Sequence, residues 1–295
     1  MRTLKTIGIL MLAIATAAPA FGQLSSVMGK IGDKVQKGKQ VLDIYTPWTP
    51  QQEEQVGQAS AARLINVFGL YENSQMVRYV NLVGSTVAQQ ATRPVPYRFG
   101  ILNTEIITAL SLPGGYVFIT RGALAHMNSE AELAGTLAHE VAHVDQRHLE
   151  KEIRSQKQMQ FIKDQTAQFT SGQLEQLTSN SLDKALSQQY SRDKEKDADR
   201  LGVTYAQKAG YQASGLRLFL TMLSEMPKTP ETQRQLGLWG STHPPLPQRI
   251  ASLEAEEASL PAGGQALAAR FSQHVSPANF AAKPAEVAKP ATAQK

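Results

Sequence analysis

The sequence His-Glu-Val-Ala-His at positions 139–143 constrains the fold of this chain more than any other feature. Residues i and i+4 of an α-helix lie on one face, so both imidazoles can reach a single metal ion at about 2.0–2.1 Å. Glu140 lies beside them, where its carboxylate can act on a water molecule. The alternative is a pair of surface histidines on an amphipathic helix.

The residues around this pentapeptide favour a buried site. Ser129, with a glutamate three positions later, forms a capping-box pattern that predicts a helix from residue 130 through His148. Leu137 and Val141 indicate that this helix is buried. Histidines and a glutamate on a buried helix need partners, because an unpaired buried charge is costly.

A third ligand is available further along the chain. Catalytic zinc sites commonly use three protein ligands and keep one position for water. A helix predicted for residues 181–208 carries Glu195 and Asp199 on one face. Glu195 can bind the same metal, while Asp199 can accept the free ring N–H of a ligand histidine. The alternative is a solvated charge run, since residues 192–197 are all charged.

The remaining pattern predicts a mostly helical metallopeptidase domain of the α+β class, with a small antiparallel sheet beside the His-Glu-x-x-His helix. Thr49 and Pro50 mark the start of one helix. The turn Pro113-Gly114-Gly115 predicts a hairpin between the strands on either side of it. The predicted helices cover 50–68, 74–90, 214–225 and 246–257, and the strands 97–102, 105–112 and 116–120.

The N-terminus has the character of an export signal. Arg2 and Lys5 precede an apolar run at 7–18, and small residues follow at positions 20 and 22. We therefore expect a signal peptide at 1–22 and a periplasmic protein, with secretion as the other option. A membrane span needs roughly 20 apolar residues, and this run ends at Pro19, so an uncleaved anchor is the weaker alternative. We expect no span in the mature chain.

Composition divides the rest of the chain. Residues 23–48 form a polar helical segment, 49–260 the zinc metallopeptidase domain, and the Ala/Pro/Lys-rich residues 261–295 a disordered tail. The Gln-rich segment 156–180 is predicted to be a lid over the cleft or a loose helical excursion.

Composition also excludes several functions. The chain has no cysteine, which excludes disulfides, thiolate zinc ligands and cysteine nucleophiles. Its net charge of +5 is spread thinly, without the basic runs and interleaved aromatics that would indicate nucleic-acid binding.

Four ordered motifs give the chain a resemblance to the HtpX-like and CAAX-prenyl-protease-like gluzincin metallopeptidases. The motifs occupy residues 112–122, 139–148, 190–199 and 241–244, within a match from about residue 49 to 253. The resemblance implies one zinc ion per chain, bound by His139, His143 and Glu195, with Glu140 as the general base. It also implies that His243 lies beside the metal.

The resemblance implies an endopeptidase in envelope protein quality control, with unfolded or misassembled polypeptides as substrates. The chain departs from the family in its short tail, and it has Thr108 where many relatives have asparagine. Two alternatives remain: a chaperone-like binding factor with a structural zinc site, and a zinc hydrolase of small molecules. Glu140 disfavours the first, because a structural site has no use for a general base.

Strand 116–120 and His243 are two further candidates for roles at the site. Strand 116–120 is predicted to be an edge that pairs with an extended substrate through Tyr116, Val117 and Phe118, unless it belongs only to the core. His243 precedes a proline, which holds it extended.

His243 can donate to the oxyanion, occupy the water position on zinc at rest, or simply pack in its loop. His148 is predicted to be structural, since a continuous helix would rotate it about 140° from His143.

Overall fold

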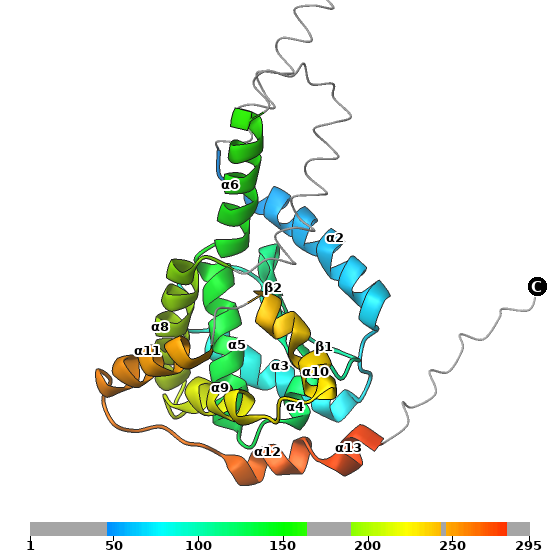
Figure 1. The fold of residues 1–295 in the computed structure, drawn as a ribbon, viewed down its shortest axis with the longest axis vertical. Helices are drawn as coiled ribbons and strands as arrows, with labels where there is room; N and C mark the ends of the chain where they lie inside the picture. The colour runs from blue at the N-terminus through cyan, green and yellow to red at the C-terminus, as the bar shows by residue number, and fades with distance from the viewer. Residues whose placement is uncertain (1–45, 164–189, 243–245, 282–295) are drawn as a thin grey trace, which may run out of the picture. The chain divides into compact units, whose positions relative to one another are not determined.

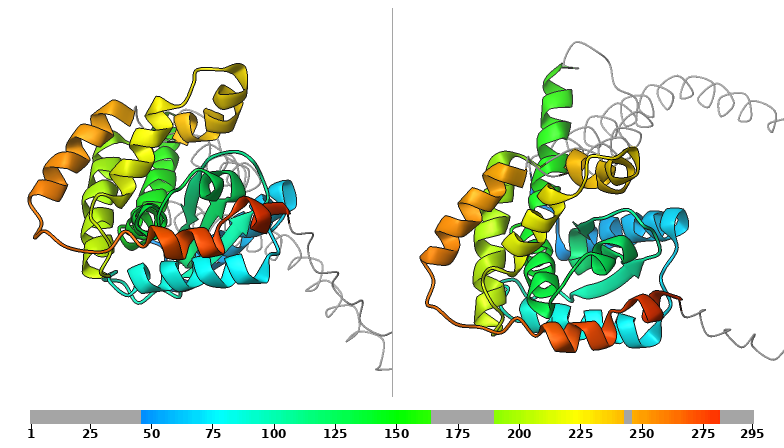
Figure 2. Two further views of the ribbon diagram at one scale, coloured as in Figure 1. Left: turned by 90° about the horizontal axis from the view of Figure 1, so that it is seen from below. Right: turned by 60° about the horizontal axis from the view of Figure 1, so that its bottom comes forward.

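The fully buried helix α5 (Glu130–Asp145) lies at the centre of the fold and carries the His-Glu-x-x-His sequence. The computed structural model describes residues 46–163, 190–242 and 246–281. α8 (Arg192–Lys208) and α11 (Leu246–Ala258) lie on one side of α5, and the sheet lies on the other (Figure 1, Figure 2). α3 (Ser74–Ala88) and α9 (Gly215–Glu225) also pack against α5.

Several expectations fall outside the described residues. They are the signal peptide at 1–22, nearly all of the segment 23–48, residues 164–189 with most of the predicted lid, His243, and the end of the tail at 282–295.

The sheet has three strands: β1 (Arg98–Leu102), β2 (Ala109–Leu112) and β3 (Tyr116–Thr120). Their order is β1-β3-β2, with β1 parallel and β2 antiparallel to β3. The sheet is therefore mixed, and the prediction of an antiparallel sheet was wrong for β1. The predicted hairpin between β2 and β3 is confirmed, and the turn η1 (Pro113–Gly115) holds two glycines at φ of 74° and 88°, which suit glycine.

The strand order also corrects the predicted substrate edge. β3 is the central strand, so the backbone of Tyr116, Val117 and Phe118 pairs with β1 on one side and β2 on the other. Val117 and Phe118 are buried in the core. The sheet edge next to α5 is β2 instead.

Four of the helices predicted from local patterns are confirmed, whereas the helix predicted for 181–208 begins at Arg192 in the described residues. α2 (Pro50–Phe68) begins with the capping box at Thr49, and α3, α9 and α11 occupy the expected residues. The helix predicted to run through His148 instead ends at Asp145, and α6 (His148–Lys163) follows after Arg147, which has φ of 54°. Two helices were not predicted from the sequence, α4 (Arg121–Ala125) and α10 (Pro230–Thr242). No helix in the described ranges has both the length and the apolar character to cross a membrane.

The first part of the predicted disordered tail is ordered. Residues 261–281 include α12 (Ala268–His274) and α13 (Pro277–Ala281). Phe271 and Val275 are buried against the core, so two apolar side chains fix a segment whose composition suggested nothing to bury.

Glu130, at the start of α5, ties this segment to the core. Arg270 of α12 pairs with its carboxylate, and the hydroxyl groups of Tyr79 and Tyr211 donate to it at 2.8 and 2.9 Å. Burial raises the pKa of Glu130, but these hydrogen bonds outweigh burial and lower the pKa below its usual value. Glu130 is therefore an ionised, fully hydrogen-bonded anchor.

Glycines set the distances between α5 and its neighbouring helices. A Cβ atom at Gly202 of α8 would lie 2.9 Å from both Cα and N of His139. A Cβ atom at Gly215 of α9 would lie 2.0 Å from the carbonyl oxygen of Ala131. Both helices therefore approach α5 more closely than any residue with a side chain would allow.

Candidate metal centre

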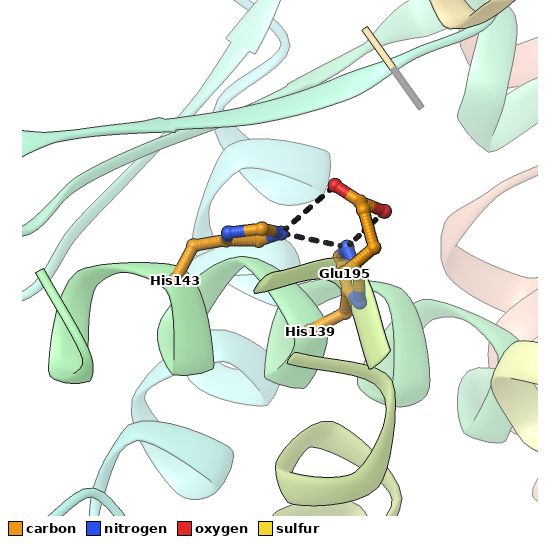
Figure 3. Close-up of side chains that lie close together, drawn as sticks. All are labelled: His139, His143 and Glu195. Atoms are coloured by element: carbon orange, nitrogen blue, oxygen red, sulfur yellow. Dashed lines mark hydrogen bonds and ion pairs between the residues drawn. The ribbon is translucent and has the colours of Figure 1, made fainter. Parts of the chain in front are cut away.

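Helices α5 and α8 bring together the side chains of His139, His143 and Glu195 (Figure 3). The Nε2 atoms of the two histidines are 3.0 Å apart. Glu195 Oε2 lies 3.8 Å from Nε2 of His139, and its Oε1 lies 3.5 Å from Nε2 of His143. The three predicted ligands thus point their donor atoms at one another; we call them the metal trio.

The metal trio fits a zinc ion. Donors at 2.0–2.1 Å from a tetrahedral centre lie about 3.3 Å from one another, and the three observed separations bracket this value. All three side chains are 1% exposed. Two imidazoles and a carboxylate form a donor set that zinc binds in catalytic sites.

Asp199 lies behind His139, on the side away from the trio. Its Oδ1 is 3.0 Å from Nδ1 of His139. This contact leaves Nε2 of His139 directed at Glu195 and His143. A carboxylate in this position fixes the tautomer and orientation of a metal-binding histidine.

Arg249, which sequence reasoning missed, clamps this carboxylate. Its Nη2 and Nε donate to the two oxygens of Asp199 at 2.7 and 3.0 Å, and its Nη1 lies 3.4 Å from Oε2 of Glu195. Burial raises the pKa of Asp199, but Arg249 and the bond to His139 outweigh it and hold the pKa well below its usual range. Asp199 is therefore ionised. In the sequence, this role was indicated only by the presence of one arginine in the helix predicted for residues 246–257.

Glu140 is buried beside the trio and is held by the sheet edge. Its Oε2 accepts a hydrogen bond of 2.8 Å from Oγ of Ser111 on β2. Burial raises the pKa of Glu140 above its usual value. Ser111 is a second site residue that was not predicted from the sequence, because nothing next to a serine in a strand indicates that it will contact a distant glutamate.

The far side of His143 is also enclosed. The ring of Tyr190 stacks on it at 4.3 Å between centroids, with an angle of 21° between the planes. His148 of α6 lies at the edge of the same ring, with its Nδ1 3.0 Å from Nδ1 of His143. A recess adjoins this group, lined by Ser111, Leu112, Pro113, His143, Leu149 and Tyr190.

A His-Glu-x-x-His helix joined by a glutamate from a second helix defines a metallopeptidase of the gluzincin type. Both the fold and the metal trio agree with this class. The chain belongs to peptidase family M48, whose model matches residues 74–257.

Curated relatives of the chain carry a common name. The beta-barrel assembly-enhancing protease of Escherichia coli K12 is 23% identical over 250 residues, which are 81% of this chain and 49% of that protein. The protein of that name from Yersinia pestis is 24% identical over 188 residues, 60% of this chain and 38% of the relative. A Vibrio cholerae protein given this name provisionally is 29% identical over 187 residues, with 60% and 39% covered. The chain spans about half or less of the length of these relatives.

Proposed function

We propose that the protein is a zinc-dependent metalloendopeptidase that hydrolyses exported polypeptides in envelope protein quality control. The observation that carries this proposal is the metal trio with Glu140 buried beside it. The names of the relatives support a role in the envelope, and the signal-like sequence at 1–22 supports export to the periplasm. The resemblance to the HtpX-like metallopeptidases supports unfolded or misassembled polypeptides as the substrates.

The chain's own residues can carry out the proton transfers. Zinc bound by the trio would polarise the scissile carbonyl and acidify water. Glu140 takes the proton from the attacking water and passes it to the leaving amine. The hydrogen bond from Ser111 orients the carboxylate, and burial makes it more basic than an exposed glutamate.

Asp199 and Arg249 hold the trio in place. Asp199 accepts the Nδ1 proton of His139 and so keeps Nε2 available to the metal. Arg249 balances the charge of Asp199 and reaches Glu195 from the same side. This arrangement orients two of the three proposed ligands before any metal binds.

We propose that β2, rather than β3, pairs with the substrate backbone. Within the described residues β1 and β2 are the edge strands of the sheet, and Ser111 places β2 next to Glu140. An extended polypeptide added along this edge would bring its peptide bonds to the trio. Pairing through the main chain gives weak sequence preference, which suits unfolded substrates.

His243 remains a proposed member of the site. It lies in the short interval between α10 and α11, outside the described residues. Arg249, near the start of α11, contacts both Asp199 and Glu195, and this supports the proposal that His243 acts at the same centre.

Digestion of casein by the wild type and by Glu140→Gln tests the proposed function. The substitution preserves the shape of the side chain and removes the base, so cleavage should fall by several orders of magnitude while the zinc content stays unchanged. Cleavage by Glu140→Gln at the wild-type rate would refute the mechanism. A wild type that binds zinc and unfolded casein without cleaving it would favour a chaperone-like factor.

A further inference from the structure

His148 faces a proposed zinc ligand because the helix that carries the ligand breaks before it. α5 ends at Asp145, and Arg147 adopts φ of 54°, a left-handed conformation that residues with a side chain rarely take. A continuous helix would have turned His148 about 140° away from His143. Instead, Nδ1 of His148 lies 3.0 Å from Nδ1 of His143. His148 and His143 are both buried, with 3% and 2% of the whole residue exposed.

The break itself is anchored by Arg147. Its guanidinium Nη1 lies 3.3 Å from the carbonyl oxygen of Trp48 and 3.3 Å from Oε2 of Glu150. Oε1 of Glu150 in turn accepts a hydrogen bond of 2.7 Å from the backbone N–H of Trp48. The left-handed residue is therefore held by contacts with Trp48, which precedes α2, and with Glu150 in the first turn of α6.

The positions of the ring protons decide what this contact does. The role of this contact rests on the proposed function, in which His143 binds zinc through Nε2, the atom that faces His139 and Glu195. A neutral imidazole carries one proton, so ligation through Nε2 places that proton on Nδ1. The Nδ1–H of His143 then points at His148 across 3.0 Å, a normal hydrogen-bond length.

Only one tautomer of His148 is compatible with this donor. Its Nδ1 must accept, so the proton of a neutral His148 resides on Nε2. That atom faces Oδ2 of Asp197 at 3.6 Å. The geometry thus allows one consistent arrangement of protons from His143 through His148 to Asp197.

We propose that His148 is the positioning residue of His143, accepting its Nδ1–H and thereby fixing its tautomer and ring orientation for zinc. The carboxylate of Asp197, 3.6 Å from Nε2 of His148, favours the proton on that nitrogen through its charge. The two histidines of the trio are supported differently. His139 has a carboxylate clamped by Arg249, whereas His143 has an imidazole.

Zinc affinity in matched variants tests the proposal. His148→Leu removes the acceptor and should weaken zinc binding about 10–100-fold, the usual cost of losing such a partner. His148→Asn returns an acceptor oxygen close to the position of Nδ1 and should recover most of the affinity. His126→Leu is the control, because His126 contacts the carbonyl oxygen of Gly122 and not the trio. Wild-type affinity in His148→Leu would overturn the proposal.

Nitrogen-15 NMR of the zinc-loaded wild type gives a result that does not depend on how the variants fold. We expect His148 to carry its proton on Nε2, with a coupling across the hydrogen bond between the Nδ1 atoms of His143 and His148. A proton on Nδ1 of His148 would overturn the proposal. If the wild type bound no zinc, the proposed function itself would fail. Zinc binding with this opposite tautomer would refute only the role of His148.

Discussion

Replacing Gly202 with alanine should loosen the metal centre without replacing any of the proposed ligands. Gly202 lies on α8, where an added Cβ atom would be 2.9 Å from both Cα and N of His139. Both contacts are with backbone, so no flexible side chain can move aside. α8 also carries Glu195 and Asp199, so a shift of this helix displaces one ligand and the partner of another.

The size of the displacement follows from van der Waals distances. Non-bonded carbon atoms rest about 3.5–4.0 Å apart, so α8 must withdraw from α5 by roughly 0.6–1 Å. Metal sites tolerate deviations of only about 0.2 Å in ligand distances. We therefore expect Gly202→Ala to weaken zinc binding about 10–100-fold. Overpacking should also reduce the free energy of unfolding by about 1–3 kcal/mol.

A second glycine separates the effect on zinc from the effect on stability. Gly215→Ala places a Cβ atom 2.0 Å from the carbonyl oxygen of Ala131, a more severe clash of α9 with α5. α9 carries no residue of the metal trio, so this control should lose at least as much stability and keep its zinc affinity within a few-fold. The assays are zinc competition with a chromophoric chelator and urea unfolding. Wild-type zinc affinity in Gly202→Ala, or an equal loss in Gly215→Ala, would refute the reasoning.

Three further perturbations test other parts of the structure. Arg249→Met leaves the carboxylate of Asp199 buried without its counter-charge and should reduce the free energy of unfolding by about 3–5 kcal/mol in urea titrations; an unchanged value would contradict the clamp. The pKa of Glu130 is lowered in the folded state, so its stabilising effect is complete above the unfolded pKa of about 4.3 and is lost as pH falls through the folded value. The melting temperature of the wild type should therefore fall more steeply below about pH 4.3 than that of Glu130→Gln, and parallel curves would argue against this anchor. His243→Ala should lose casein cleavage with zinc retained if His243 supports the transition state, or gain activity if it blocks the site at rest; wild-type kinetics would leave it a packing residue.

The parts of the fold that were predicted correctly depend on local chemistry. Thr49 caps α2 through contacts within four residues, and the glycines of η1 are required by a tight turn. The spacing of His139 and His143 on a helix is likewise a local property. Glu195 was predicted as the third ligand because a catalytic zinc site commonly uses three protein ligands.

The errors arise where distant segments decide the outcome. The position of β3 between β1 and β2 is set by packing that hydrophobicity along each strand does not encode, so the substrate edge was misplaced. α5 ends just before Arg147, which adopts a positive φ, and no glycine or proline at this point of the sequence predicts the break. Arg249 meets Asp199 only after α11 has packed against α8 and α9. Two buried side chains, Phe271 and Val275, order a segment of disorder-like composition.

Zinc content measured by mass spectrometry on the purified protein tests the central claim most directly, namely that the metal trio is a metal-binding site. The account predicts about one zinc ion per wild-type chain, as in a single catalytic site. His139→Ala, His143→Ala and Glu195→Ala should each lose most of that zinc while remaining folded by circular dichroism. A wild type without zinc after purification in its presence, or a folded triple variant that still holds one ion, would contradict it.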